Sequence, residues 1–547
     1  MRKIHADVVV IGGGSTGAGV VRDLAMRGYS AVLVDRADLA QGTSGRFHGL
    51  LHSGGRYVVS DPVSATECAQ ENAIVTAIHA DAVERTGGLF VCPPGDDPAF
   101  GDTFLDDAER AKVPCQEIAV AEALRREPRL NRRISRAIEV EDGAVDGWTL
   151  VWGAARSAMQ HGATILPYHH VDAIEVSNGQ VVGARCTALK PGERVDIDCG
   201  FAINAAGPWA GRIAELAGCH GVEVVSGRGV MVAMAHRLVN TVVNRLAYPA
   251  DGDILVPVHT VCVIGTTDTL ADDPDRLPIT PAEVRQLLDS GETLVPGLRQ
   301  ARALHAWSGA RPLVKDSRVA GDDTRHMSRE MSVIDHAQRD GLSGFVTVVG
   351  GKLTTYRLMA KKAVDVMCAQ LGHNRPCLTD QEAVPGARQG HNYQVTQRLA
   401  EREHDRLQDQ IVCECELASR GQLTRLWADN PLATLDDARR QLRLGMGPCQ
   451  GGFCAARAAG IACQTKVADA ERATAMLRLF LKNRWIGSWP VLHGEQLRQM
   501  ALDAWILQGA HDIEHVAPTG EVPGELRPCD GSEDVFDADG KAEEVAK

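Results

Sequence analysis

The sequence predicts a protein of the α/β and α+β classes, in which a second, sheet-containing domain interrupts a nucleotide-binding fold and a small cysteine-rich domain follows. The chain has 547 residues, too many for one compact core. An apolar run near the N-terminus leads into a glycine-rich turn, and four cysteines cluster between residues 413 and 454. Hydrophobic residues make up 44% and charged residues 24%, which is typical of a globular protein and excludes a fibrous or mostly disordered chain.

The charge and the hydropathy of the chain argue against two further classes of protein. The 58 basic and 71 acidic residues give a net charge of −13, which argues against nucleic-acid binding through a general basic surface. No run of about 18 apolar residues occurs, so we expect no membrane-spanning helix. The apolar run at the N-terminus is short and ends at Gly12, unlike that of a signal peptide. We therefore expect a cytoplasmic protein.

The N-terminal residues predict a βαβ unit. Residues 7–11 form an apolar run suited to a buried parallel strand, and residues 18–27 have the apolar spacing of a helix. Further strands are expected at residues 31–35, 163–166, 201–205 and 344–349, and an antiparallel strand within residues 261–267. This alternation predicts a nucleotide-binding sheet with another sheet domain inserted into it.

The turn after the first strand carries the pattern Gly12-x-Gly14-x-x-Gly17 of dinucleotide-binding folds. Gly12 permits the tight turn, Gly14 lets the backbone approach a pyrophosphate, and Gly17 allows the helix to pack closely on the strand. Unpaired N–H groups at the helix N-terminus favour the phosphates. Asp35, at the end of the second strand, is placed to bind ribose hydroxyls, which favours FAD or NAD over NADP.

Four further segments resemble the FAD-dependent glycerol-3-phosphate dehydrogenase family. They are residues 42–57, 204–210, 308–313 and 350–357, and they occur in the family's order. The resemblance implies FAD as the cofactor and a D-amino-acid-oxidase-like FAD-binding fold with an interleaved antiparallel-sheet substrate domain. It also implies cofactor contacts from seven more residues: Thr43, Ser44, Arg46, Gly207, Trp209, Gly351 and Thr354.

A group of cations in this acidic chain indicates an anionic substrate. Arginine forks pair with phosphate through two hydrogen bonds, and lysine adds a point charge. The resemblance implies the oxidation of sn-glycerol 3-phosphate to dihydroxyacetone phosphate by hydride transfer to FAD. It assigns four residues to binding and orienting the substrate phosphate: Arg56, Tyr57, Arg329 and Lys352.

His52 is our preferred general base, because a neutral imidazole can accept the hydroxyl proton near pH 7. His48 is the alternative base, and His52 could instead only hydrogen-bond the flavin edge. Arg311 would stabilise the developing alkoxide or hold the phosphate. Aerobic relatives have a Gly-Ser-His segment where this chain has Gly227, Arg228 and Gly229. The histidine is absent and Arg228 adds a cation nearby, which we interpret as a trait of a subgroup.

Fifteen cysteines need an explanation in a protein expected in the cytoplasm, where structural disulfides are rare. Eleven are scattered and are interpreted as small buried hydrophobic residues. Cys413, Cys415, Cys449 and Cys454 form C-x-C and C-x₄-C pairs, and four thiolates on two loops can bind a [2Fe-2S] cluster or a zinc ion. We favour the cluster, because zinc sites more often use C-x₂-C in both halves. The segment resembles the bacterioferritin-associated-ferredoxin-like [2Fe-2S] domain.

An FAD region followed by this cysteine domain resembles the A (catalytic) subunits of anaerobic glycerol-3-phosphate dehydrogenases. The resemblance implies two partner subunits, one associated with flavin and one iron–sulfur subunit that attaches to the membrane. It therefore implies a peripheral location at the inner face of the cell membrane. Electrons would leave through the [2Fe-2S] cluster to a partner or a quinone.

We expect five segments along the chain. They are an FAD-dependent oxidoreductase region at 1–380 with its substrate domain at roughly 76–144 and 231–329, a linker at 381–409, the [2Fe-2S] domain at 410–466, a helical segment at 467–515, and a disordered acidic tail at 516–547. Phe480, Trp485 and Trp489 are among the expected apolar anchors of the helical segment.

The sequence leaves two other functions open. The chain could be an FAD-dependent dehydrogenase of another 2-hydroxy acid or of an amine, although such substrates do not need so many cations. It could also be a non-catalytic flavin and iron–sulfur redox module that senses or relays electrons. The presence of His52, Arg56, Arg311 and Lys352 together argues against a sensor, which needs no substrate pocket.

Overall fold

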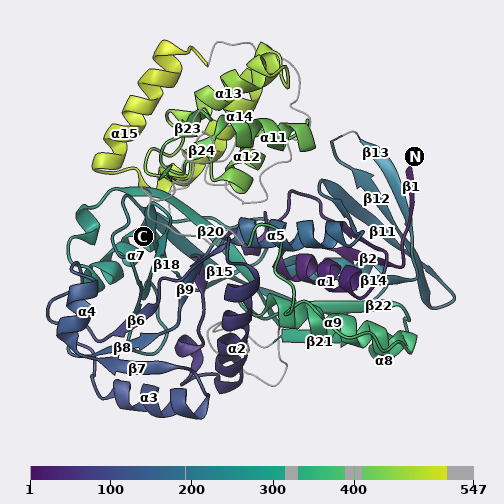
Figure 1. Cartoon of the computed structure of the whole chain (residues 1–547), viewed down its shortest axis with the longest axis horizontal. Coiled ribbons are helices and arrows are strands. Elements are labelled where there is room, and N and C mark those ends of the chain that lie inside the picture. The colour runs from purple at the N-terminus through teal and green to yellow at the C-terminus, as the bar shows by residue number, and fades with distance from the viewer. Residues whose placement is uncertain (1, 191, 315–330, 388–398, 401–408, 514–547) are drawn as a thin grey trace.

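The computed structural model describes residues 2–190, 192–314, 331–387, 399–400 and 409–513. Arg329, Cys529 and the acidic tail at 516–547 lie outside the described residues, as does most of the linker. Figure 1 shows three parts: two domains side by side, and a C-terminal domain, coloured green to yellow, that lies against both.

The first domain is built on a six-stranded sheet in the order β10-β3-β2-β14-β22-β21. The strands are β2 (Val8–Ile11), β3 (Ala31–Val34), β10 (Thr164–Leu166), β14 (Phe201–Asn204), β21 (Met331–Asp335) and β22 (Phe345–Gly350). Neighbouring strands run parallel except at the edge, where β21 pairs antiparallel with β22. The five strands expected here from the sequence are confirmed to within one residue at either end.

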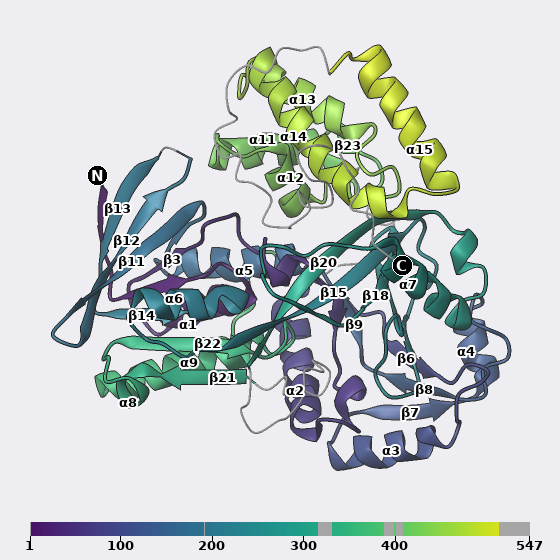
Figure 2. The same ribbon diagram turned by 180° about the vertical axis from the view of Figure 1, so that it is seen from behind.

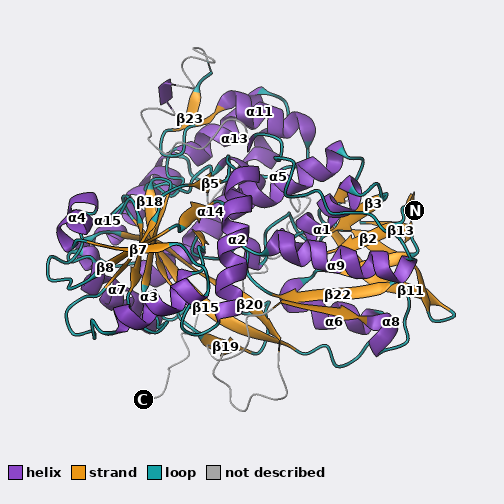
Figure 3. Ribbon diagram, turned by 60° about the horizontal axis from the view of Figure 1, so that its bottom comes forward, coloured by secondary structure: helices purple, strands orange, loops and turns teal. Residues whose placement is uncertain are grey.

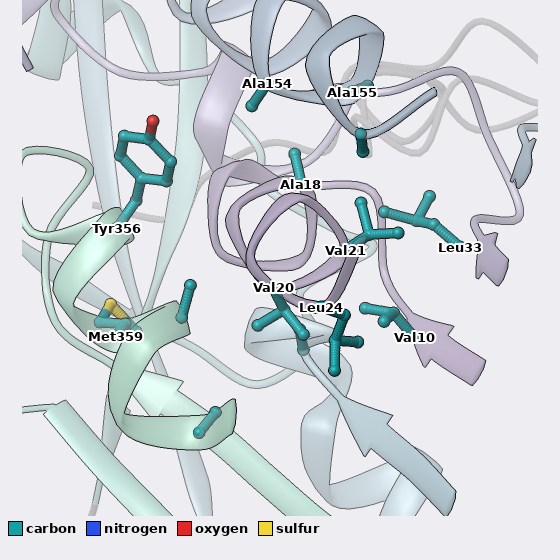
Figure 4. Packing of buried hydrophobic residues seen from close by; sticks show 14 of the residues in the cluster. Val10, Ala18, Val20, Val21, Leu24, Leu33, Ala154, Ala155, Tyr356 and Met359 are labelled. Atoms are coloured by element: carbon teal, nitrogen blue, oxygen red, sulfur yellow. The ribbon is translucent and has the colours of Figure 1, made fainter. Parts of the chain in front are cut away.

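Three helices cover one face of this sheet: α1 (Ser15–Met26), α5 (Gly147–Gln160) and α9 (Tyr356–Leu371). In Figure 4, Ala18 of α1 lies toward Ala154 of α5, while Leu24 lies beside Val10 of β2. Small residues let α1 approach its neighbours closely, since a Cβ added at Gly19 would lie 2.9 Å from the ring of Tyr356. These contacts hold the N-terminus of α1 at the carboxyl end of β2.

A four-stranded sheet covers the other face of the first domain. Its order is β1-β13-β12-β11, with β1 (Arg2–His5), β11 (His169–Ser177), β12 (Gln180–Ala188) and β13 (Glu193–Asp198). Because side chains alternate along a strand, Val9 and Val32 face this second sheet and pack with residues such as Val181 and Ile197. The nucleotide-type domain therefore has three layers.

The second domain is built on a nine-stranded sheet. Eight strands follow the order β19-β15-β18-β17-β16-β6-β8-β7, and β20 pairs with β15. They are β6 (Gly88–Val91), β7 (Cys115–Ile118), β8 (Ala137–Val140), β15 (Val224–Met234), β16 (Val242–Arg245), β17 (Ile254–Val258), β18 (Val261–Gly265), β19 (Thr269–Ala271) and β20 (Ala303–Val314). The antiparallel strand expected within 261–267 is confirmed as β18. Figures 2 and 3 show the long strands β15 and β20 side by side.

Smaller elements complete these two domains. They are β4 (Leu50–Leu51), β5 (Val83–Glu84), β9 (Gly143–Val145), α2 (Pro62–Ile78), α3 (Phe100–Arg110), α4 (Val120–Arg126), α6 (Ala210–Leu216), α7 (Pro281–Leu294) and α8 (His336–Arg339). Helix α7 buries Val284, Leu287 and Leu288 against the nine-stranded sheet. It also carries the carboxylate of Glu283, which pairs with Arg228.

The C-terminal domain is mainly helical around a core that includes Trp427 and Phe480. Its elements are β23 (Ile411–Cys413), β24 (Ala418–Ser419), α11 (Arg420–Asp429), α12 (Leu435–Leu442), α13 (Cys454–Gln464), α14 (Ala470–Ser488) and α15 (Glu495–Ala504). The segment expected to be helical contains α14 and α15. The prediction that Trp489 is an apolar anchor is wrong: its side chain is 54% exposed, because it lies at the C-terminal cap of α14, beyond the packed face.

A buried ionic bridge fixes the C-terminal domain against the other two. The Arg443 guanidinium donates from Nη1 to Asp146 (3.0 Å) and from Nε to Glu416 (2.9 Å). His259, in the turn between β17 and β18, lies 3.3 Å from the same Glu416 carboxylate. Asp146 also caps the N-terminus of α5. All four side chains are buried, so one guanidinium satisfies carboxylates from two domains.

Replacing Arg443 with methionine should lower the free energy of unfolding by about 3–5 kcal/mol, because it leaves two buried carboxylates without their cation. The matched control is Arg457→Met, whose partner Glu414 is 63% exposed, and that pair is worth at most about 1 kcal/mol. Urea unfolding followed by circular dichroism measures both. An equal loss of unfolding free energy in the two variants would contradict the stabilising role of this bridge.

The bridge should also make stability depend on pH. Burial raises the pKa of Glu416 and of Asp146, but the charge of Arg443 outweighs it, so both pKa values lie below their ordinary range. A carboxyl with a depressed folded pKa contributes stability above its unfolded pKa, about 4, and loses it as pH falls through the folded value. Wild type should therefore lose more stability than Arg443→Met between about pH 6 and about pH 3. Urea midpoints that fall by the same amount in wild type and in Arg443→Met would refute this pH dependence.

Candidate functional site

The carboxyl ends of β2 and β3 open onto a cavity of about 490 Å³. Gly14 caps α1 there without a side-chain hydrogen bond, and the first turn of α1 has no acidic residue, so its backbone N–H groups face an anion-binding position. Gly12 has φ +111°, and its Cβ would lie 2.5 Å from the carbonyl oxygen of Ala205. A Cβ on Gly17 would lie 1.8 Å from the carbonyl oxygen of Gly12. The glycine pattern is therefore required by the close approach of backbone segments.

Asp35 and Ser44 line the same end of this cavity. The Asp35 carboxylate accepts hydrogen bonds from the N–H groups of Gly13 (2.6 Å) and Ala37 (2.7 Å), which hold it at the end of β3. The Ser44 hydroxyl accepts from the N–H of Ser15 (2.9 Å). This polar end, with helix N–H groups and a carboxylate, suits a pyrophosphate joined to a ribose.

The far end of the cavity is formed by residues 350–354 together with His48, His52, Tyr57 and Arg311. Gly350 and Gly351 both have positive φ, and Thr354 accepts a hydrogen bond from the His52 N–H (3.1 Å). The Lys352 ammonium lies 4.5 Å from the centre of the Tyr57 ring. A long cavity with a phosphate-type end and an end of mixed aromatic and cationic groups fits an FAD molecule.

Most of the cofactor residues expected from the sequence lie around this one cavity. The lining includes Gly12, Gly14, Asp35, Thr43, Ser44, Gly207, Trp209, Gly351 and Thr354. Gly17 lies behind it, where it permits the packing of α1. Arg46 is not in this lining and instead lines two adjoining cavities.

A smaller cavity of about 90 Å³ adjoins the far end, and it shares Thr43, His48, His52, Tyr57 and Arg311 with the larger one. Its other lining residues include Arg56 and Arg46. Arg311 of β20 is thus brought together with His52, Arg56 and Tyr57, which lie in one segment near the N-terminus. Lys352 lines only the larger cavity, beside Tyr57.

Two acidic residues that sequence reasoning missed hold these arginines. Asp253 accepts from Arg56 Nη2 (2.9 Å), and Asp268 accepts from Arg311 Nη1 (2.9 Å). Arg311 Nη2 also donates to the Thr266 hydroxyl (2.5 Å). In the sequence, only the polar residues that directly follow strand β18 could have indicated an acidic partner for an arginine. Each guanidinium is therefore oriented before any anion arrives.

The two candidate histidines differ in their surroundings. His48 Nδ1 accepts a hydrogen bond from the N–H of Leu50 (3.1 Å), so a neutral His48 carries its proton on Nε2 and has its basic nitrogen occupied. The His52 ring lies 5.2 Å from the Tyr57 ring and lines both cavities. This geometry favours His52 over His48 as a proton acceptor.

Arg228 does not add a cation to the site, contrary to the prediction. It pairs with Glu283 of α7 (2.6 Å) and donates to the Thr269 hydroxyl (3.0 Å) and to the carbonyl of Pro278. Successive side chains of a strand point to opposite faces of its sheet. Gly227 and Gly229 face Arg311, so the Arg228 side chain between them points to the other face of β15.

The four clustered cysteines meet at one place in the C-terminal domain. Cys413 ends β23, Cys415 follows it, Cys449 lies in a glycine-rich loop and Cys454 begins α13. The Cys415 and Cys449 sulfurs are 4.0 Å apart, and this thiol contact lowers the pKa of Cys449 to about 6. A Cβ on Gly447 would lie 2.2 Å from the Cβ of Cys415, so the loops can close only with glycine there. Four thiols in this arrangement fit a [2Fe-2S] cluster or a tetrahedral metal.

Of the scattered cysteines, seven are buried and three are half-buried within the described residues. A further cavity of about 240 Å³ lies between the two sites. Phe47 and His48 line it on one side, and Met446 and Gln450 of the cysteine loop line it on the other. The flavin cavity and the cysteine loop therefore border the same space.

Comparison with known proteins agrees with this geometry. The family model of FAD dependent oxidoreductases matches residues 7–357, and that of the BFD-like [2Fe-2S] binding domain matches residues 411–462. The predicted FAD-binding fold is therefore confirmed, and the four thiols are assigned to a [2Fe-2S] domain rather than to zinc.

Relatives match nearly the whole chain. The A subunit of the anaerobic glycerol-3-phosphate dehydrogenase of Escherichia coli (strain K12) is 39% identical over 536 residues, which cover 93% of this chain and 97% of the relative. The A1 subunit of the enzyme of the same name from Haloferax volcanii is 39% identical over 528 residues, covering 91% and 89%. The structure of glycerol-3-phosphate dehydrogenase from Bacillus halodurans complexed with FAD shares the fold, with a TM-score of 0.58, 22% identity, and coverage of 94% of this chain and 96% of that one.

Replacing Cys449 with serine should abolish the cluster and leave FAD in place, because the flavin cavity contains none of the cysteine loop. Iron analysis and the visible spectrum of anaerobically purified protein measure both cofactors. Cys463→Ser, a half-buried cysteine outside the group of four, is the control and should keep its iron. Full iron content in Cys449→Ser would exclude Cys449 as a ligand.

Proposed function

This chain belongs to the family of FAD-dependent oxidoreductases that includes the A subunits of anaerobic glycerol-3-phosphate dehydrogenase, and we propose that it oxidises sn-glycerol 3-phosphate to dihydroxyacetone phosphate. Electrons would pass from FAD to the [2Fe-2S] cluster. The observation that carries the proposal is the adjoining pair of cavities, in which a histidine and two oriented arginines surround the far end of the flavin cavity.

The cations supply recognition of the substrate phosphate. Arg56 is fixed by Asp253, and Lys352 lies over the Tyr57 ring, so both positive charges are held in place before substrate binds. A phosphate dianion can accept hydrogen bonds from the guanidinium edges that the acids leave uncovered. The planar guanidinium groups match the tetrahedral array of phosphate oxygens through paired N–H donors, which favours a phosphate ester.

His52 is proposed to take the proton from the C2 hydroxyl. Its backbone N–H donates to Thr354, in the segment at the flavin end, so the residue is held beside that end of the cavity. Arg311, held by Asp268 and Thr266, is placed to stabilise the negative charge that develops on the C2 oxygen as the proton leaves. Bound FAD supplies the hydride acceptor, and the cluster supplies a one-electron acceptor.

Partner proteins are part of the proposal. A dehydrogenase with a [2Fe-2S] domain must pass its electrons on, and we propose partner subunits that carry flavin and iron–sulfur clusters, one of them attached to the inner face of the cell membrane. Among the described residues, no helix has both the length and the apolar character needed to cross a membrane. In this proposal, membrane attachment belongs to one of the partners.

The test is the visible spectrum of anaerobically purified protein before and after addition of sn-glycerol 3-phosphate. The flavin bands should bleach on addition, above a broader iron–sulfur absorbance. Bleaching by another hydroxy acid or an amine, but not by glycerol 3-phosphate, would keep the fold and overturn the substrate. A flavin that none of these compounds reduces would refute the enzymatic function.

Substituting His52 with asparagine should lower kcat by about 10²- to 10⁴-fold, the usual range for loss of a general base, while FAD remains bound. His48→Asn is the matched control and should lose far less, because His48 Nδ1 already accepts a hydrogen bond from Leu50. Steady-state assays with an artificial electron acceptor measure both variants. A larger loss in His48→Asn would reverse the assignment.

A further inference from the structure

Two arginines hold the residues on either side of Cys449. Arg302, which directly precedes β20 in the second domain, donates from Nη2 to the carbonyl of Pro448 (2.6 Å) and from Nη1 to Gln496 (3.1 Å). Arg484 of α14 donates to the side-chain oxygen of Gln450. The Gln450 amide in turn donates to the carbonyl of Gly447 (2.9 Å). The loop that carries Cys449 is therefore clamped between two guanidinium groups.

These two arginines differ from Arg440 and Arg443, which are buried at the same interface. Arg440 and Arg443 each pair with two carboxylates, whereas the described part of the chain places no carboxylate within ion-pair distance of Arg302 or Arg484. Arg484 is only 5% exposed, and its Nε has no hydrogen-bond partner among the described residues. A buried cation without an anion is costly. Without a carboxylate in direct contact, anions at longer range must balance it.

The neighbouring anions include the cysteine thiolates. Burial lowers the pKa of Arg484 to about 9 and the charge of Arg439 adds to this effect, while Asp436 and the thiolates of Cys454 and Cys449 oppose it. The pKa of Arg302 is also lowered by burial, against the opposing charges of Asp503, Cys449 and Cys415. Three of the four thiolates thus lie in the field of one or both arginines.

We propose that Arg302 and Arg484 are positioning residues that raise the reduction potential of the [2Fe-2S] cluster. A cluster gains one negative charge when it takes up one electron, so fixed cations beside its thiolates stabilise the reduced form more than the oxidised form. The clamp makes the cluster a better acceptor for electrons from the flavin. This inference rests on the [2Fe-2S] assignment and extends the proposed function to its electron exit.

A redox titration of the FAD- and cluster-loaded chain, followed by electron paramagnetic resonance of the reduced cluster, tests the proposal. Arg302→Gln and Arg484→Gln keep a hydrogen-bond donor and remove the charge. Each should shift the ratio of reduced to oxidised cluster at a given potential by about tenfold, a fall of about 59 mV for a one-electron couple. Arg125→Gln, in an exposed pair with Glu122 on helix α4 of the second domain, is the control and should leave the potential unchanged.

Unchanged potentials in both glutamine variants, with full iron content, would overturn the proposal. If a glutamine variant loses its cluster, Arg302→Lys and Arg484→Lys decide the matter. These lysine variants keep the positive charge but lack the planar guanidinium group. A reduction potential equal to that of wild type therefore supports the proposal, and a lowered potential overturns it. Bleaching of the flavin by glycerol 3-phosphate in the same samples reports separately on the proposed function, because neither arginine lines the flavin or substrate cavity.

Discussion

The guanidinium of Arg443 is the interaction on which the arrangement of the two cofactor sites depends. It joins Asp146, which caps the helix behind the flavin cavity, to Glu416, which directly follows Cys415 in the [2Fe-2S] domain. Buried carboxylates are tolerated only with a matching cation, so neither acid can separate from Arg443 without a large electrostatic penalty. Arg440 adds a second bridge to Asp38 of the first domain (2.7 Å). These contacts fix the distance over which electrons must travel.

The substrate cavity uses the same principle on a smaller scale. Asp253 and Asp268 hold Arg56 and Arg311 in place, at the expense of part of their positive charge. An anionic substrate therefore meets oriented donors rather than mobile cations, and it does not have to order them when it binds. The cluster site differs, because among the described residues no carboxylate contacts Arg302 or Arg484 directly, so their charge acts on the thiolates as well as on Asp503 and Asp436. Carboxylates position the cations at the substrate cavity, whereas the loop backbone and an amide position them at the cluster site.

The sequence predicted the parts of the molecule that local rules determine. Gly12 and Gly17 have roles that follow from a strand, a turn and a helix, and the C-x-C spacing of Cys413 and Cys415 favours a cluster over zinc. Contacts between distant segments could not be predicted. Nothing near Arg228 in the sequence indicates Glu283, and the face of β15 on which it lies depends on register with β20. The role of Arg443 likewise depends on how separate domains dock.

We propose that one chain carries electrons from the substrate to its own cluster across this fixed interface. Rapid anaerobic mixing of the loaded chain with sn-glycerol 3-phosphate, followed at flavin and iron–sulfur wavelengths and by electron paramagnetic resonance of frozen samples, tests it directly. We expect the flavin to bleach first and the cluster to be reduced afterwards, and the rate of cluster reduction should not depend on protein concentration. A flavin that bleaches while the cluster stays oxidised, or a cluster reduced only at a rate that rises with protein concentration, would contradict it.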